Sequence, residues 1–247
     1  MTDASDSGEL ERLKGELIEA ASTLFAVQVY QGERVREQSL AAFGKLVDAH
    51  LLTMGVLGTA LLRVNGKFSE TTPTSIQRNA LFASFVIGIP VCERTICEGH
   101  YLQAGALLRQ EVETLAALSE VTAGNRKDGR VPNLGSLEPS IARLYGDLSA
   151  AAHVSKHHIV NAATEWNQSI YGAPGPAAVA RHFPIFDESI AKRFYALHIY
   201  LILRLVEQLS IDFSAQRHDA FTQREARAVG VAINLMIEEK ALERDPS

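Results

Sequence analysis

The sequence predicts an all-α protein, and three observations carry this prediction. Apolar residues recur at three- and four-residue spacing through most of the chain, which is the period of amphipathic helices. Alternating patterns typical of strands are nearly absent. The 247 residues are 47% hydrophobic and 21% charged, as expected for a soluble globular protein. We therefore expect a single helical bundle of about six or seven helices.

The expected helices follow one another with Gly- or Pro-containing breaks between them. Gly32 separates the first two, and one bent helix over both is the alternative. Thr74 or Ser75 is expected to cap the third helix, which Pro90 should kink. Ser136 is expected to cap the fifth. In chain order the helices cover residues 7–31, 33–64, 75–98, 100–122, 137–153, 187–213 and 222–242.

The chain is expected to form one domain overall, with two parts. Residues 1–64 form an N-terminal helical segment that packs on the bundle or extends it, and residues 65–247 form the bundle core. Separate docking of the first 60 residues and homodimerisation through them are both open. Residues 155–185 mix a helical pattern with a Gly/Pro-rich stretch, and so long an irregular segment often covers a site.

Composition bears on compartment and partners. The net charge is −5 and the isoelectric point is 5.9, so we expect no general nucleic-acid binding. The N-terminus lacks the basic and apolar regions of a signal peptide. The apolar runs 51–62 and 196–206 are shorter than the roughly 20 residues of a membrane span. Cys92 and Cys97 are too poorly aligned on one helix to bridge. We therefore expect a cytoplasmic protein without a membrane span.

Three polar side chains stand beside the apolar face of the helix predicted over residues 137–153. Tyr145, Ser149 and His153 follow at four-residue steps, so they drift only about 40° per step around the helix. One interpretation is purely structural: the tyrosine packs its ring, the serine bonds a carbonyl, and the histidine ends the helix. The other interpretation is that these three side chains hydrogen-bond to polar groups on a neighbouring helix.

The preceding helix supplies such groups. Arg109 and Glu113 are four residues apart and are flanked by apolar residues, so the pair is expected to be half-buried. Charged groups in such a place need each other and further polar partners. The two helices are joined by a loop of about a dozen residues, so they can pack antiparallel. The sequence thus predicts an internal polar cluster of Arg109, Glu113, Tyr145, Ser149 and His153.

These motifs carry a resemblance to a known family. ALLRQEVETL followed after a loop by YGDLSAAAH is similar to uncharacterised bacterial all-helical proteins that are described only as a domain of unknown function. The matching positions are Arg109, Glu113, Tyr145, Leu148, Ser149 and His153, within a similarity that covers roughly residues 75–215. The resemblance implies a helical fold and a shared polar cluster. It implies no reaction.

Two catalytic or metal-binding interpretations compete with a binding role. Arg94–His100 and Arg193–His198 match the Arg-x(4–6)-His spacing of ribonucleases found among helical toxin and abortive-infection proteins, although chance yields about as many matches. His153 and His157 lie one turn apart beside His158, and Glu113 could add a carboxylate, but no HExxH motif accompanies them. We therefore expect no metal and no cofactor.

The function expected from the sequence is that of a non-catalytic module that binds a small ligand or a protein partner. The alternative is a ribonuclease-like or otherwise hydrolytic enzyme. An enzyme needs its polar groups to converge at an open cleft, whereas a structural cluster is closed and fully hydrogen-bonded.

Overall fold

The computed structural model describes residues 3–64, 71–153, 160, 164–166, 179–180, 182–215 and 221–242. These residues form seven α-helices, a short 3-10 helix and a two-residue antiparallel strand pair. The all-α fold expected from the sequence is thereby confirmed. The elements are α1 (Asp3–Phe43), α2 (Lys45–Val64), α3 (Pro73–Cys97), α4 (Tyr101–Thr122), η1 (Leu134–Ser136), α5 (Pro139–Ala152), β1 (Glu165–Trp166), β2 (Val179–Ala180), α7 (Glu188–Ala215) and α8 (Gln223–Glu238).

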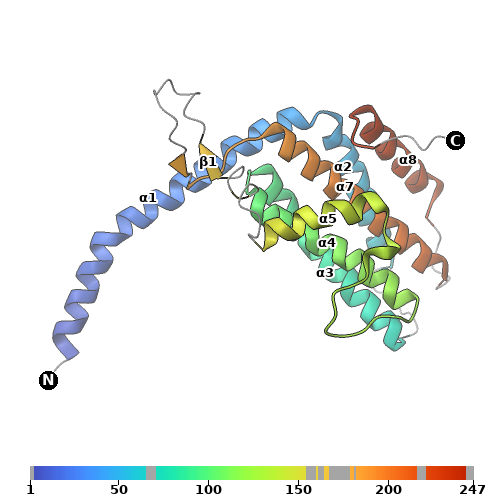
Figure 1. The fold of residues 1–247 in the computed structure, drawn as a ribbon, viewed down its shortest axis with the longest axis horizontal. Helices are drawn as coiled ribbons and strands as arrows, with labels where there is room; N and C mark the ends of the chain where they lie inside the picture. The colour runs from blue at the N-terminus through green and yellow to red at the C-terminus, as the bar shows by residue number, and fades with distance from the viewer. Residues whose placement is uncertain are drawn as a thin grey trace.

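The bundle is arranged around α7, which contacts α1, α2, α3 and α4. α8 packs on α2 at one side of the bundle, and α5 packs on α4 at another (Figure 1). Large apolar side chains of α4 and α7, such as Leu108, Leu118, Ile202 and Leu205, are fully buried. The division of the chain at residue 64 stays a prediction, although α2 is one of the helices that pack against α7 and α8.

α1 is one continuous helix, so the break expected at Gly32 is wrong. Gly32 lies inside the helix and is buried, and a β-carbon there would lie 3.6 Å from the side chain of Glu98. Gly32 thus packs beside Glu98, the residue that follows α3. The helix ends instead at Gly44, whose positive φ of 54° suits glycine. A β-carbon at Gly44 would also lie 2.8 Å from a carboxylate oxygen of Glu239.

Two predicted caps are also displaced. Thr72 caps α3, with Pro73 following it and Ser75 completing a reciprocal capping box. α5 begins after Glu138, which makes no side-chain cap, because Ser136 belongs to the preceding 3-10 helix. α3 runs uninterrupted through Pro90. The kink at that proline stays a prediction.

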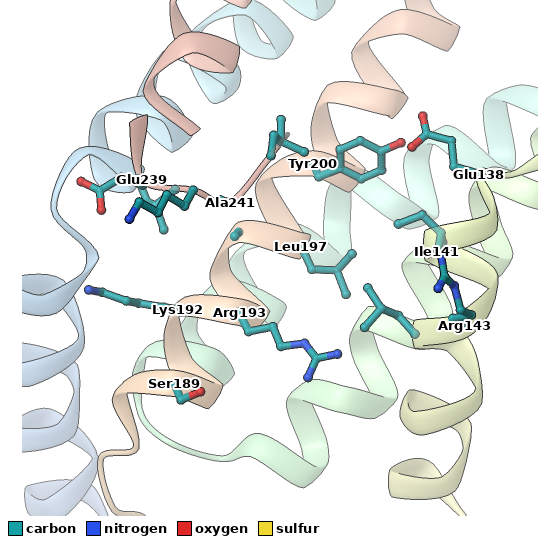
Figure 2. A pocket seen from close by; sticks show the side chains of 15 residues that line it. Glu138, Ile141, Arg143, Ser189, Lys192, Arg193, Leu197, Tyr200, Glu239 and Ala241 are labelled. Carbon is teal, nitrogen blue, oxygen red and sulfur yellow. The ribbon is translucent and has the colours of Figure 1, made fainter. Parts of the chain in front are cut away.

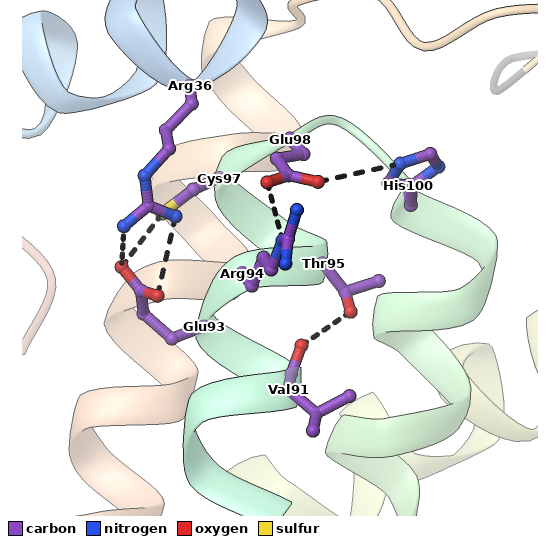
Figure 3. A network of polar contacts seen from close by, with 8 residues as sticks. All are labelled: Arg36, Val91, Glu93, Arg94, Thr95, Cys97, Glu98 and His100. Carbon is purple, nitrogen blue, oxygen red and sulfur yellow. Dashed lines mark hydrogen bonds and ion pairs between the residues drawn. The ribbon is translucent and has the colours of Figure 1, made fainter. Parts of the chain in front are cut away.

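Polar contacts fix the C-terminal half of α1 to the bundle (Figure 3). Arg36 donates to both carboxylate oxygens of Glu93 on α3, at 3.1 and 3.5 Å. The thiol of Cys97 lies 3.4 Å from the same carboxylate. Further along, Phe43 stacks on Tyr195 of α7 with ring centroids 4.1 Å apart. In the N-terminal half of the helix, by contrast, residues 7–27 are all exposed.

Glu225 joins α8 to α2. Its carboxylate accepts hydrogen bonds from the backbone amide of Thr222 and the hydroxyl of Thr59, both at 2.8 Å, and it pairs with Arg63. Burial alone would raise the pKa of Glu225, but these hydrogen bonds outweigh it and hold the pKa below its ordinary value. The ionised carboxylate therefore stabilises the folded state above the ordinary Glu pKa, and this contribution is lost as the pH falls through the folded pKa.

Replacing Glu225 with glutamine is expected to lower the free energy of unfolding at pH 7 by about 2 kcal/mol, because the ion pair with Arg63 and the charge-assisted hydrogen bonds from Thr222 and Thr59 are lost. The difference from wild type should shrink as the pH falls below about 4.3. Urea unfolding at pH 7 and pH 3.5 measures both effects. Glu238→Gln is the matched control on α8, since its pair with Lys45 is exposed and surface ion pairs contribute little to stability. A constant difference across pH would contradict this assignment.

Three helices of the described chain are long and apolar enough, by length and composition, to cross a membrane: Lys45–Val64, Pro73–Cys97 and Glu188–Ser214. The apolar runs 51–62 and 196–206 lie inside two of these helices, which continue past the charged residues that interrupt or bound the runs. A cytoplasmic location without a membrane span stays a prediction.

Candidate functional site

α4 and α5 bring four of the five predicted cluster residues together. Arg109 Nε donates to Glu113 Oε1 at 2.9 Å and to the Tyr145 hydroxyl at 3.3 Å. The Tyr145 hydroxyl donates to the same Glu113 oxygen at 2.6 Å. Arg109 NH1 lies 2.7 Å from His153 Nε2, and its guanidinium carbon lies 5.5 Å from the centre of the Tyr145 ring. The arginine is therefore the hub of the cluster.

Ser149 does not join this cluster. Its side chain is half-buried and takes part in none of the hydrogen bonds that the described residues make around Arg109. One helical turn separates it from both Tyr145 and His153, and those longer side chains span the distance that a serine hydroxyl cannot. The expectation that Ser149 is a cluster member is therefore not met by its contacts.

The cluster is half-buried, and its described polar groups are bonded to one another. The side chains of Arg109 and Glu113 are 18% and 25% exposed, and His153 is exposed at the end of α5. Burial and the hydrogen bond to Glu113 raise the pKa of Tyr145, so this hydroxyl stays protonated as a donor. Hydrogen bonds to Tyr145 and Glu113 outweigh desolvation and raise the pKa of Arg109. Such an arrangement joins two helices and fixes their register.

Replacing Tyr145 with phenylalanine is expected to lower the free energy of unfolding by about 1 kcal/mol, because Glu113 and Arg109 each lose one hydrogen bond at a partly exposed site. Tyr30→Phe is the control, since Tyr30 is 58% exposed on α1 and should change stability by less than about 0.5 kcal/mol. Equilibrium urea unfolding compares the two variants. Equal effects would mean that the cluster does not hold α5 on α4.

The two Arg/His pairs of the ribonuclease alternative do not bring their side chains together at one open site. His198 is 0% exposed and lies 3.0 Å from Glu111 in the core, whereas Arg193 lines a surface groove. Arg94 and His100 both face Glu98, at 2.7 and 4.0 Å (Figure 3). In the pair Arg193/His198, the histidine is buried in the core while the arginine lies at the surface. In the pair Arg94/His100, the carboxylate of Glu98 lies between the two side chains.

The metal interpretation of the His153 region rests on His157 and His158, which lie outside the described residues. The same holds for most of residues 155–185, whose lid role stays a prediction. Of that segment, the structure describes the bridge of β1 with β2. It also describes residues 182–187, where the carbonyl of His182 accepts from the side chain of Gln28 at 3.2 Å.

A groove between α5 and α7 was not anticipated from the sequence. It has a volume of about 860 Å³ and also borders the residues that follow α8. Figure 2 shows Arg193 extending from α7 toward α5, with Leu197 and Ile141 on the two helices. Arg143 and Arg193 make no ion pair with any described residue. Of the two acidic lining residues, Glu138 pairs with Arg204 at 3.9 Å, and Glu239 accepts a hydrogen bond from the backbone amide of Lys45 at 3.1 Å. The groove thus offers cationic side chains beside an apolar floor.

The sequence likewise did not indicate that the N-terminal half of α1 presents an apolar stripe to solvent. Six small or apolar residues follow one another at alternating steps of three and four residues, and all six are exposed: Leu10, Leu13, Leu17, Ala20, Leu24 and Val27. We call this set the α1 seam. The exposed fractions of its three leucines at seven-residue steps, Leu10, Leu17 and Leu24, are 52%, 63% and 49%.

Comparison with models of protein families, with curated proteins and with solved structures finds no match for this chain. The similarity to the bacterial helical family therefore stays a prediction. Function is inferred below from the surfaces and clusters of this molecule alone.

Proposed function

We propose that this protein is a non-catalytic interaction module that forms a homodimer through the α1 seam. The observation that carries the proposal is the N-terminal half of α1, which leaves the bundle as a bare helix (Figure 1). Residues 7–27 are exposed throughout, yet every third or fourth of them is apolar. An isolated helix of this kind is marginal in water unless its apolar stripe is covered.

The spacing of the seam matches a second copy of the same helix. Steps of three and four residues from Leu10 to Val27 fill six successive a and d positions of a heptad repeat, which is the pattern of a coiled coil. Leu10, Leu17 and Leu24 occupy the a positions. In a coiled coil, each a or d side chain inserts into a hole formed by four side chains of the facing helix. A second copy of α1 offers these holes at matching positions, so the two-fold interface closes as a dimer.

Charge favours a parallel arrangement. Glu9 falls at a g position and Lys14 at the following e position. In a parallel pair these residues face each other across the interface, and the two-fold axis produces the contact twice. An antiparallel pair would place g beside g and e beside e, which brings like charges together. The parallel dimer therefore also positions both bundles at the same end.

A cysteine at the seam tests this geometry. Ala20→Cys places a thiol at a d position, and Ser22→Cys places one two residues along on the opposite face. In a parallel dimer in register, mild oxidation is expected to cross-link Ala20→Cys and to leave Ser22→Cys monomeric on a denaturing gel. The native thiols of Cys92 and Cys97 are buried and should not interfere.

Equal cross-linking of both variants would indicate random collision and would contradict the dimer. A further outcome is binding of the monomer to phospholipid vesicles through α1, because exposed leucines also suit a lipid surface. Co-sedimentation with vesicles that abolishes cross-linking of Ala20→Cys would replace the homodimer with a membrane contact.

The groove between α5 and α7 supports a second candidate function, the binding of an anionic small molecule with an apolar body. Two arginines without ion-pair partners among the described residues can hold a carboxylate or phosphate beside Leu197 and Ile141. A fluorescent long-chain fatty acid is a suitable probe. Arg193→Gln is expected to weaken its binding roughly tenfold, whereas Lys192→Gln should not, since Lys192 pairs with Glu188 at 2.9 Å. Unchanged affinity in Arg193→Gln would exclude the groove.

A further inference from the structure

A second polar group lies in the middle of the bundle, far from solvent. Cys92 of α3, Glu111 of α4 and His198 of α7 each offer one metal-ligand atom, and these atoms lie within 4.8 Å of one another. The exposed fractions of the three residues are 1%, 5% and 0%. Three different helices thus direct a thiol, a carboxylate and an imidazole to one point in the core.

The hydrogen bonding of this group is incomplete. His198 Nδ1 lies 3.0 Å from Glu111 Oε2. Glu111 Oε1 lies at the same 3.0 Å from this nitrogen, whereas the other ring nitrogen, His198 Nε2, is buried without a hydrogen-bond partner among the described residues. Buried polar atoms of this kind are rare in native structures and call for an explanation such as a bound water or ion.

A fourth side chain extends the group to α2. The ring of His50 lies 5.7 Å from that of His198, centre to centre, and its Nε2 is also buried without a hydrogen-bond partner among the described residues. A second imidazole nitrogen without a hydrogen-bond partner among the described residues thus lies beside the group.

From this geometry we infer that Cys92, Glu111 and His198 form a site for a divalent transition-metal ion. A thiolate, a carboxylate and an imidazole are ligands that zinc takes in its sites in proteins. Binding releases the thiol proton of Cys92 to solvent. The thiolate and the Glu111 carboxylate then balance the two positive charges of the ion, which leaves the core neutral.

The alternative is a closed hydrogen bond between Glu111 and His198 that binds nothing. The two interpretations differ in what they require of Cys92. A metal site needs its sulfur as a ligand, whereas in the alternative the thiol only hydrogen-bonds to Glu111. Cys97 is a matched control, because it is buried on the same helix but contacts Glu93 rather than Glu111.

Cobalt(II) reports on a thiolate ligand directly. The full-length protein is unfolded, refolded with excess Co²⁺, and freed of unbound metal on a desalting column. Wild type and Cys97→Ser are expected to retain about one equivalent and to show a thiolate-to-cobalt charge-transfer band. Cys92→Ser should lose this band, and His198→Gln should retain roughly tenfold less metal. Failure of wild type to hold cobalt, or an unchanged band in Cys92→Ser, would overturn the inference.

A measurement on wild type alone covers the case in which the core variants do not fold. Zinc added during refolding is expected to raise the melting temperature by several degrees, and a strong chelator during refolding should reverse the shift. The same comparison on Cys97→Ser should give the same shift. No shift in either protein would contradict the site. The dimer proposed above does not depend on this outcome, since the seam and the metal site share no residue.

Discussion

Replacing Leu17 and Leu24 with glutamate is expected to convert the dimer into a monomer, with the dissociation constant raised at least about a thousandfold. Both leucines occupy a positions of the α1 seam. Each loses roughly 1.5–3 kcal/mol of burial, and the two-fold axis counts each loss twice. Four carboxylates would also face one another at the interface.

The matched control is Leu62→Glu together with Leu51→Glu on α2, whose side chains are 74% and 63% exposed. These residues are as exposed as those of the seam but belong to no heptad repeat. Light scattering after size-exclusion chromatography gives the mass of each variant, and circular dichroism checks that the bundle is folded. A monomeric control pair beside a dimeric seam variant would assign the interface to α2 instead.

Removing the carboxylate of Asp212 is expected to destabilise the bundle by about 3–5 kcal/mol, the largest single effect on folding. Arg78 of α3 is buried, and its Nε and NH2 donate to Asp212 of α7 at 3.1 and 2.6 Å. Its NH1 donates to the carbonyl of Leu118 on α4 at 3.2 Å. Without Asp212 the guanidinium remains buried with one neutral acceptor, which is strongly unfavourable.

A double variant separates the unpaired charge from the loss of contacts. Asp212→Ala with Arg78→Met removes both charges and keeps an apolar side chain at residue 78, so it should recover a large part of the stability lost in Asp212→Ala. Chemical denaturation of wild type, both single variants and the double variant completes the cycle. If the double variant is the least stable of the four, the buried charge is not the reason for the loss.

The fold class could be predicted from the sequence because apolar residues recur at helical spacing through most of the chain. Boundaries failed where glycine serves packing rather than a turn. Gly32 lies inside a helix beside Glu98, whereas Gly44 ends the helix with a positive φ. The residue type alone does not distinguish these two roles. The caps failed for a related reason, since Thr72 precedes Pro73 in a stretch that holds several other capping residues.

The polar cluster could be predicted because its members lie on consecutive helices at helical spacing. Arg109, Glu113 and Tyr145 required only one assumption, that α4 and α5 pack antiparallel. Ser149 fitted the same periodicity, but its short side chain does not reach the cluster, and periodicity carries no information about side-chain length.

The core group was missed because its members are far apart in the sequence. Cys92, Glu111 and His198 come from three helices, and only their packing brings them together. One signal was present in the sequence. Glu111 follows Leu108 by three residues and precedes Leu115 by four, so an acidic residue stands on the apolar stripe of α4. A charged residue on a core-facing stripe needs a partner there.

The mass of the wild-type protein in dilute aqueous buffer tests the central claim most directly. Sedimentation equilibrium across a range of micromolar concentrations is expected to give twice the chain mass of 26.9 kDa, with dissociation only on strong dilution. A mass of one chain at every concentration would mean that the leucines of α1 meet something other than a second copy of this helix.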